Sequence, residues 1–102
     1  MHSDGYIDFE WDDEKAAANI RNHGVTFEEA ADAFSDPYAR LAPDAAHSGE
    51  EERFFLIGMD FRARVLTVCH CERRGGTRIR IISARESTRT EAAQYWRYRN
   101  GN

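Results

Sequence analysis

Alternation of apolar and polar residues predicts the strands of this chain. Apolar residues at positions 7, 9 and 11 are typical of a short strand with one buried face. Three later segments are rich in β-branched and aromatic residues and are separated by short turns, so we expect an antiparallel meander. The expected strands cover residues 6–11, 38–41, 53–59, 64–73 and 77–85, with a polar loop at 43–52.

Two helices are expected between the first strand and the polar loop. Asp12 or Asp13 can cap the first helix, and Gly24 is a natural stop. Thr26 and Glu29 have the spacing of a capping box, which opens the second helix. An apolar stripe at i, i+3, i+4 and i+7 is most simply core packing; it comprises Phe27, Ala30, Ala31 and Phe34.

A third helix is expected at the end of the chain, where Thr88 and Glu91 form another capping box. Ala92, Ala93 and Trp96 are available to dock this helix on the rest of the protein. The remaining large side chains, Tyr95, Arg97, Tyr98 and Arg99, then lie on its other sides.

This order of elements predicts one α+β domain over residues 1–102. We expect a small antiparallel sheet, formed by a three-stranded meander and short N-terminal strands. The two N-terminal helices pack on one face of the sheet, and the C-terminal helix follows the meander. The other face is left partly open and is a candidate binding surface.

Charge changes this picture, because the net charge of −4 conceals two opposite halves. Residues 1–60 carry a balance of −11, whereas residues 61–102 hold 3 acidic residues against 10 arginines. A basic surface binds polyanions through counterion release, so nucleic acid is the expected ligand. No signal peptide or bilayer-spanning segment is evident, and the expected location is the cytoplasm.

Cys69 and Cys71 are expected to be reduced thiols, because a bridge between residues two apart in a strand is strained. Alternation directs His70 to the opposite face, and no second pair of ligands completes a tetrahedral site. We therefore expect neither a metal nor another cofactor.

Candidate chemistry is concentrated in the last two strands. Alternation places His70 and Glu72 on one face, where they can bracket a phosphate, and an imidazole can move protons near neutral pH. The next strand carries Arg78 and Arg80, which we expect beside that pair on the open face, although its alternation breaks around residues 81–82. A structural role is the alternative: Glu72 pairs with an arginine across the strands and His70 lies at a sheet margin. The expected catalytic residues are His70, Glu72, Arg80 and Arg85.

Neighbouring cationic, hydroxyl and aromatic residues are candidates for binding RNA, because guanidinium groups hold phosphate oxygens and aromatic rings stack on bases. The expected RNA-binding residues are Arg73, Arg78, Ser83, Tyr95 and Arg97.

Taken together, these motifs resemble the BrnT family of bacterial type II toxins. The resemblance runs from about residue 9 to residue 95, nearly the whole chain. It is carried by Phe9-Glu10-Trp11-Asp12, Glu14-Lys15-Ala16, Asn19, His23-Gly24-Val25, Phe27-Glu28-Glu29-Ala30, Phe34-Ser35-Asp36-Pro37, Glu52-Arg53, Ile57-Gly58, His70-Cys71-Glu72-Arg73, Ile79-Arg80-Ile81-Ile82-Ser83-Ala84-Arg85, Arg89, Glu91 and Tyr95.

The resemblance implies a RelE-like fold and a ribonuclease that arrests translation without a metal. It also implies an antitoxin of ribbon-helix-helix type, BrnA-like, which would form a heterotetramer with the toxin and bind operator DNA on its behalf. One departure is Asn22, where the family usually has lysine before the His-Gly pair. If that lysine holds RNA, binding from this corner is weaker here.

Two other functions fit parts of the sequence. The paired helices followed by strands superficially suggest a winged-helix regulator that binds DNA without catalysis. The helix that would enter the groove carries Glu28, Glu29 and Asp32 and no basic residue, which argues against this reading. The other alternative is a partner-binding module whose basic surface receives an acidic protein.

Overall fold

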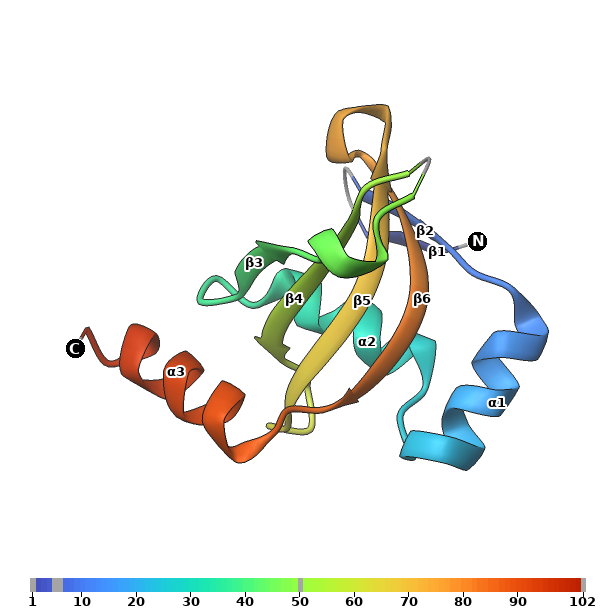
Figure 1. Ribbon diagram of the computed structural model, residues 1–102. Coiled ribbons are helices and arrows are strands. Elements are labelled where there is room, and N and C mark those ends of the chain that lie inside the picture. The colour runs from blue at the N-terminus through green and yellow to red at the C-terminus, as the bar shows by residue number, and fades with distance from the viewer. Residues whose placement is uncertain (1, 5–6, 50, 102) are drawn as a thin grey trace.

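The computed structural model describes residues 2–4, 7–49 and 51–101 and shows a six-stranded mixed sheet with three α-helices (Figure 1). The α+β class is confirmed, and the predicted strand residue Tyr6 lies outside the described residues. The strands are β1 (His2–Asp4), β2 (Ile7–Glu10), β3 (Arg40–Pro43), β4 (Arg53–Met59), β5 (Val65–Arg73) and β6 (Arg78–Glu86). The helices are α1 (Asp13–His23), α2 (Phe27–Asp32) and α3 (Arg89–Arg99), with 3-10 turns η1 (Ala33–Ser35), η2 (Ala45–His47) and η3 (Arg74–Gly76).

The sheet has the order β1-β2-β6-β5-β4-β3. Its central part is the predicted meander, since β4, β5 and β6 pair antiparallel. The prediction of a wholly antiparallel sheet is wrong, because β2 runs parallel to β6 with Phe9 opposite Ile79. Parallel strands need a long crossover. Here α1, α2 and the strands β3, β4 and β5 separate β2 from β6 along the chain, so the alignment of the two strands could not be read from local turns.

Strand β3 begins two residues later than predicted. Asp36 accepts a hydrogen bond from the backbone N–H of Tyr38 at 2.9 Å, and the Ala39 N–H donates to the Asp36 carbonyl at 3.0 Å. These bonds fold residues 36–39 into a turn. The chain is therefore free to pair with β4 only from Arg40 onward.

Helices α1 and α2 cover one face of the sheet, which we call the helix face. Its side chains Leu66, Val68, Ile79 and Ile81 are at most 2% exposed and form one core with Val25, Phe27 and Ala30 of the helical segment. The predicted caps are present: Asp12 accepts from the Lys15 N–H, and Thr26 and Glu29 form the capping box. Burial of this apolar surface is the main force holding the helices on the sheet.

Helix α3 contacts the opposite face of the sheet and presents a different side from the one predicted. Tyr95 is fully buried, and its hydroxyl donates to the Asp36 carboxylate at 2.6 Å, whereas Trp96 is 41% exposed. Glu91, one turn earlier, binds Arg85 and Thr67. The helix thus docks through Glu91, Tyr95 and Arg99, spaced four residues apart. Tyrosine takes the inner position because its hydroxyl finds a half-buried acceptor there, the Asp36 carboxylate.

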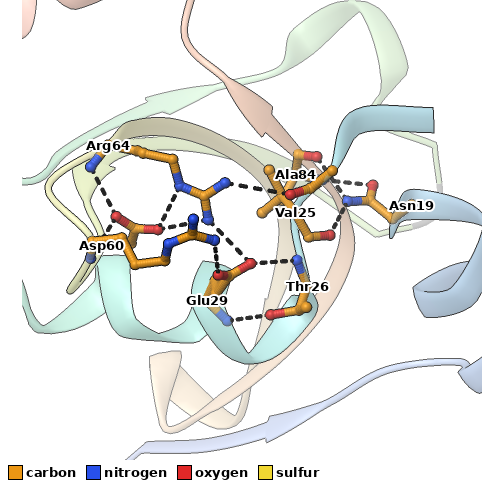
Figure 2. A network of polar contacts seen from close by, with 9 residues as sticks. Asn19, Val25, Thr26, Glu29, Asp60, Arg64 and Ala84 are labelled. Atoms are coloured by element: carbon orange, nitrogen blue, oxygen red, sulfur yellow. Dashed lines mark hydrogen bonds and ion pairs between the residues drawn. The ribbon is translucent and has the colours of Figure 1, made fainter. Parts of the chain in front are cut away.

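A polar network ties α2 to the turn between β4 and β5 (Figure 2). Glu29 receives the N–H of Thr26 at 2.8 Å and pairs with Arg64 at 3.0 Å and Arg62 at 3.1 Å. Arg64 in turn binds Asp60, whose side chain is fully buried, at 2.9 Å. The hydrogen bond from the Thr26 backbone is the main reason that the pKa of Glu29 is lowered from 4.5 to about 2.

Replacing Glu29 with glutamine is expected to lower the free energy of unfolding at pH 7 by about 1–2 kcal/mol. A carboxyl with a lowered folded-state pKa stabilises above its unfolded pKa of 4.5, and this contribution is lost as the pH falls toward about 2. The stability difference between wild type and variant should therefore shrink over that window in thermal melts. A difference that stays constant from pH 7 to pH 2 would contradict the assignment.

Candidate functional site

The strand register assigns the predicted site residues to two different faces. Cys71 lies opposite Arg80, and Arg73 lies opposite Arg78, on the side away from α1 and α2. We call this side the open face. Glu72 lies opposite Ile79 and His70 opposite Ile81, so both belong to the helix face. The prediction that His70 and Glu72 share a face with Arg78 and Arg80 is therefore wrong. Alternation along β5 puts His70 on the same face as Leu66 and Val68, and these two residues belong to the core under the helices.

His70 is fully buried between two aromatic rings. Its ring centroid lies 4.8 Å from that of Phe34 and 5.9 Å from that of Phe54. Its Nδ1 is 3.3 Å from the Val68 carbonyl, and its Nε2 is 3.4 Å from the Glu72 carboxylate. Burial lowers the pKa of His70, which favours the neutral ring. These surroundings are those of a packed core histidine, which favours the structural role of His70 and Glu72 over the catalytic role that the sequence predicts for them.

Replacing His70 with alanine is expected to lower the free energy of unfolding by about 2–3 kcal/mol, because it leaves a cavity between the two phenylalanines. The ribonuclease activity that the family resemblance implies should stay, per folded molecule, within about threefold of the wild-type rate. Urea unfolding and cleavage assays on the same preparations measure the two quantities. A folded variant with a hundredfold slower reaction would show that His70 is catalytic after all.

A β-bulge opposite the Cys69–His70 step shapes the open face. Cys69 pairs with Ser83 and His70 with Ile81, so Ile82 is the extra residue on β6. The predicted break in alternation around residues 81–82 is thus confirmed. A bulge redirects side chains. Here it lets Arg80 and Ser83, three residues apart, point to the same face.

A pocket of about 370 Å³ lies on the open face. Arg80 and Ile82 of β6, Cys71 of β5 and Arg53 of β4 line it from the sheet. Its rim comes from outside the sheet, where α1 contributes Lys15 and the segment around η2 contributes His47, Gly49 and Glu51. In Figure 1 the bright-green turn η2 lies against β4. The basic side chains of Lys15, Arg53 and Arg80 and the imidazole of His47 therefore line one pocket.

Acidic side chains from the first half of the chain occupy the same face. Glu10 of β2 pairs with Arg80 at 3.0 Å and with Arg73 and Arg78 at 3.5 Å each. Glu51 forms a bidentate pair with Arg73 at 2.7 and 2.8 Å, and this hydrogen bonding lowers the pKa of Glu51. Carboxylates thus hold the arginines in place and balance much of their charge. An anionic ligand must compete with them.

The other predicted site residues are dispersed. Arg85 lies on the open face but holds Glu91 at 2.7 and 3.1 Å, and its hydrogen bond lowers the pKa of Glu91 to about 2. Ser83 is half-buried on the same face, and Arg97 is exposed on α3. The ring of Tyr95 is fully buried and its hydroxyl is held by Asp36, so this packing offers no exposed ring surface to a base, and its RNA-binding role stays a prediction.

Several pocket residues were not among the predicted site residues. Lys15 and Arg53 carried the family resemblance, so their motifs were a signal that assigned no role. His47 was missed because residues 43–52 read as a polar loop. The available signal was the spacing Asp44-x-x-His47, which places two side chains on one side of a helical turn.

The geometry suits an anionic ligand whose phosphate sits among guanidinium and ammonium groups. Across residues 2–4, 7–49 and 51–101, no three His, Cys, Asp or Glu side chains gather in a way that could hold a metal ion. None of the described helices has the length and apolar character needed to cross a bilayer.

A small mixed sheet with α1 and α2 on one face and a basic pocket on the other defines an α+β protein whose pocket suits an anionic ligand. The chain belongs to the BrnT family, described as "Ribonuclease toxin, BrnT, of type II toxin-antitoxin system", which it matches over residues 11–91. Members of this family are toxins that act as ribonucleases, and the description of a toxin-antitoxin system implies an antitoxin partner.

A solved structure supports the fold. The crystal structure of the Brucella abortus ribonuclease toxin BrnT superposes with a TM-score of 0.61 at 24% sequence identity. The alignment covers 81% of this chain and 99% of that protein. Sequence identity at this level supports a shared fold but does not support a shared functional site. A comparison with curated proteins found no match.

Proposed function

We propose that this chain is the toxin of a type II toxin-antitoxin pair and acts as a metal-independent endoribonuclease in the cytoplasm, as a single domain with a RelE-like fold. The observation that carries the proposal is the pocket on the open face, where Lys15, Arg53 and Arg80 converge beside an imidazole. Cations stabilise the charge that develops on a phosphodiester under attack, and an imidazole can move the proton. RNA supplies its own nucleophile, the 2′-hydroxyl, so the reaction needs no cofactor.

The expected partner is a BrnA-like antitoxin of ribbon-helix-helix type in a heterotetramer, which binds operator DNA on behalf of the toxin. Family membership supports an antitoxin. The charge of the site supports an acidic contact segment, because carboxylates of Glu10 and Glu51 already serve as ligands for its arginines. An antitoxin carboxylate placed there would compete with RNA for the same cations.

The winged-helix alternative finds no support in the fold. Helix α2 would be the recognition helix, yet it is only six residues long and buries Phe27 and Ala30 against the sheet. Its Glu29 is engaged with Arg62 and Arg64. No basic residue lies in this helix to meet a phosphate.

Two measurements test the proposal. The purified protein should cleave RNA in the presence of EDTA, and induced expression should arrest growth unless the product of the adjacent reading frame is co-expressed. Tight binding of that product without any RNA turnover would instead identify a partner-binding module. Harmless expression at good yield would count against a toxin.

A further inference from the structure

The turn η2 holds an aspartate and a histidine together at the edge of the pocket. Nδ1 of His47 lies 3.1 Å from both carboxylate oxygens of Asp44. The Asp44 side chain is 6% exposed, whereas that of His47 is 68% exposed and lines the pocket. A buried carboxylate thus faces an imidazole that substrate can reach.

Hydrogen bonds fix this pair to the sheet. The Asp44 N–H donates to the Arg53 carbonyl at 2.8 Å, and the Ser48 hydroxyl donates to the Asp44 carbonyl at 2.9 Å. The Arg53 N–H in turn donates to the Ser48 hydroxyl oxygen at 3.0 Å. The turn is therefore fastened at both ends to the residue that supplies one of the pocket's cations. Such support holds a functional group in a defined place.

The carboxylate also decides which ring nitrogen is available for chemistry. A carboxylate only accepts hydrogen bonds, so Nδ1 of His47 must carry the proton that it shares with Asp44. Nε2, on the far side of the ring, is then the unprotonated nitrogen of the neutral imidazole. This is the tautomer that a general base requires.

We propose that His47 is the general base of the ribonuclease reaction and that Asp44 is its positioning residue. This inference rests on the proposed function. Nε2 of His47 takes the proton of the 2′-hydroxyl, the O2′–P bond forms and the P–O5′ bond breaks. The leaving 5′-oxygen takes a proton from water, and the imidazolium later returns its proton to solvent. The products are a 2′,3′-cyclic phosphate and a 5′-hydroxyl end.

Glu51 and Cys71 also line the pocket. Hydrogen bonding to Arg73 lowers the pKa of Glu51, which favours its carboxylate. Burial raises the pKa of the Cys71 thiol, which keeps it protonated. The proton transfer is therefore assigned to His47 from geometry, because its exposed imidazole lines the pocket and a buried carboxylate orients it.

The test compares His47→Gln and Asp44→Asn with wild type on a short RNA, together with His23→Gln. His23 is an exposed histidine at the end of α1 and serves as the matched control. His47→Gln should lower kcat by about 10²–10⁴-fold. Binding of the same RNA carrying 2′-O-methyl groups, which cannot react, should change by less than about threefold, because the phosphate cations remain. The control should behave as wild type.

Asp44→Asn should lower kcat by about 10–100-fold and change the shape of the pH profile of kcat. A purely structural Asp44 would lower the melting temperature and leave the profile of the folded enzyme unchanged, which would overturn its role. As a second test, the His47→Ala variant should regain part of the wild-type cleavage rate when imidazole is added to the buffer.

The outcomes separate this inference from the proposed function. If His47→Gln cleaves RNA at the wild-type rate while Arg80→Ala does not, the base is elsewhere and the ribonuclease proposal stands. If the wild-type protein itself leaves RNA intact, with or without EDTA, the proposed function fails first. A 3′-phosphate product formed without a cyclic intermediate would also overturn the step described for His47.

Discussion

Replacing Arg80 with alanine is expected to slow RNA cleavage by about 10²–10³-fold, the usual cost of losing a charged donor to the transition state. Arg80 projects from β6 into the pocket, and its side chain is 35% exposed. In the free protein one of its Nη groups binds Glu10 at 3.0 Å, which orients the guanidinium. The planar group has five donors, so others remain for two phosphate oxygens.

Single-turnover cleavage at saturating RNA measures this effect on the chemical step. Arg80→Lys should recover only part of the rate, because an ammonium group cannot make the bidentate contact. Arg89→Ala removes an exposed arginine at the start of α3 and is the matched control for lost charge. Equal losses in Arg80→Ala and Arg89→Ala would mean that general electrostatic attraction, and not this pocket, sets the rate.

Replacing Asn19 with alanine is expected to lower the free energy of unfolding by about 3 kcal/mol, because three buried hydrogen bonds between this side chain and the backbone are lost together. The Asn19 amide donates to the carbonyls of Val25 at 2.9 Å and Ala84 at 2.8 Å, and its oxygen accepts the Ala84 N–H at 3.0 Å (Figure 2). The Asn19 side chain thus hydrogen-bonds to the backbone of β6 as a neighbouring strand would. Strand β2 pairs with β6 only as far as Arg80, and Asn19 binds β6 beyond that point, at Ala84. The melting temperature should fall by about 15 °C.

Thermal unfolding followed by circular dichroism checks this effect, with Asn22→Ala as the control. Asn22 lies on the same helix and is exposed, so its replacement should change the melting temperature by less than about 2 °C. A loss for Asn19→Ala no larger than that of the control would show that water replaces the amide at no cost.

The two charged halves of the sequence do not correspond to two parts of the structure. The acidic half supplies the helices on the helix face, but it also supplies Glu10, Glu51, Asp44 and His47 to the open face. The parallel pairing of β2 with β6 brings Glu10 directly opposite Arg80. Basic and acidic residues separated along the chain are therefore interleaved in space, which gives a pocket of arginines already oriented by carboxylates.

By itself, the sequence determined the features that depend on neighbours along the chain. Caps at Asp12, Thr26 and Thr88, the stop at Gly24 and the meander of β4, β5 and β6 follow from short-range hydrogen bonding and from apolar periodicity. The same local motifs were sufficient for the family resemblance, which the match over residues 11–91 confirms.

Only the tertiary structure decided which face of the sheet carries the basic pocket. A period of two says that His70 and Arg80 each alternate with their neighbours, but the relative phase of two strands depends on their register and on the bulge at Ile82. That phase buried His70 between two phenylalanines and turned Arg80 toward Lys15 and Arg53. Contacts between distant segments made this choice: packing of α1 and α2 fixed the buried face, and η2 brought His47 to the other.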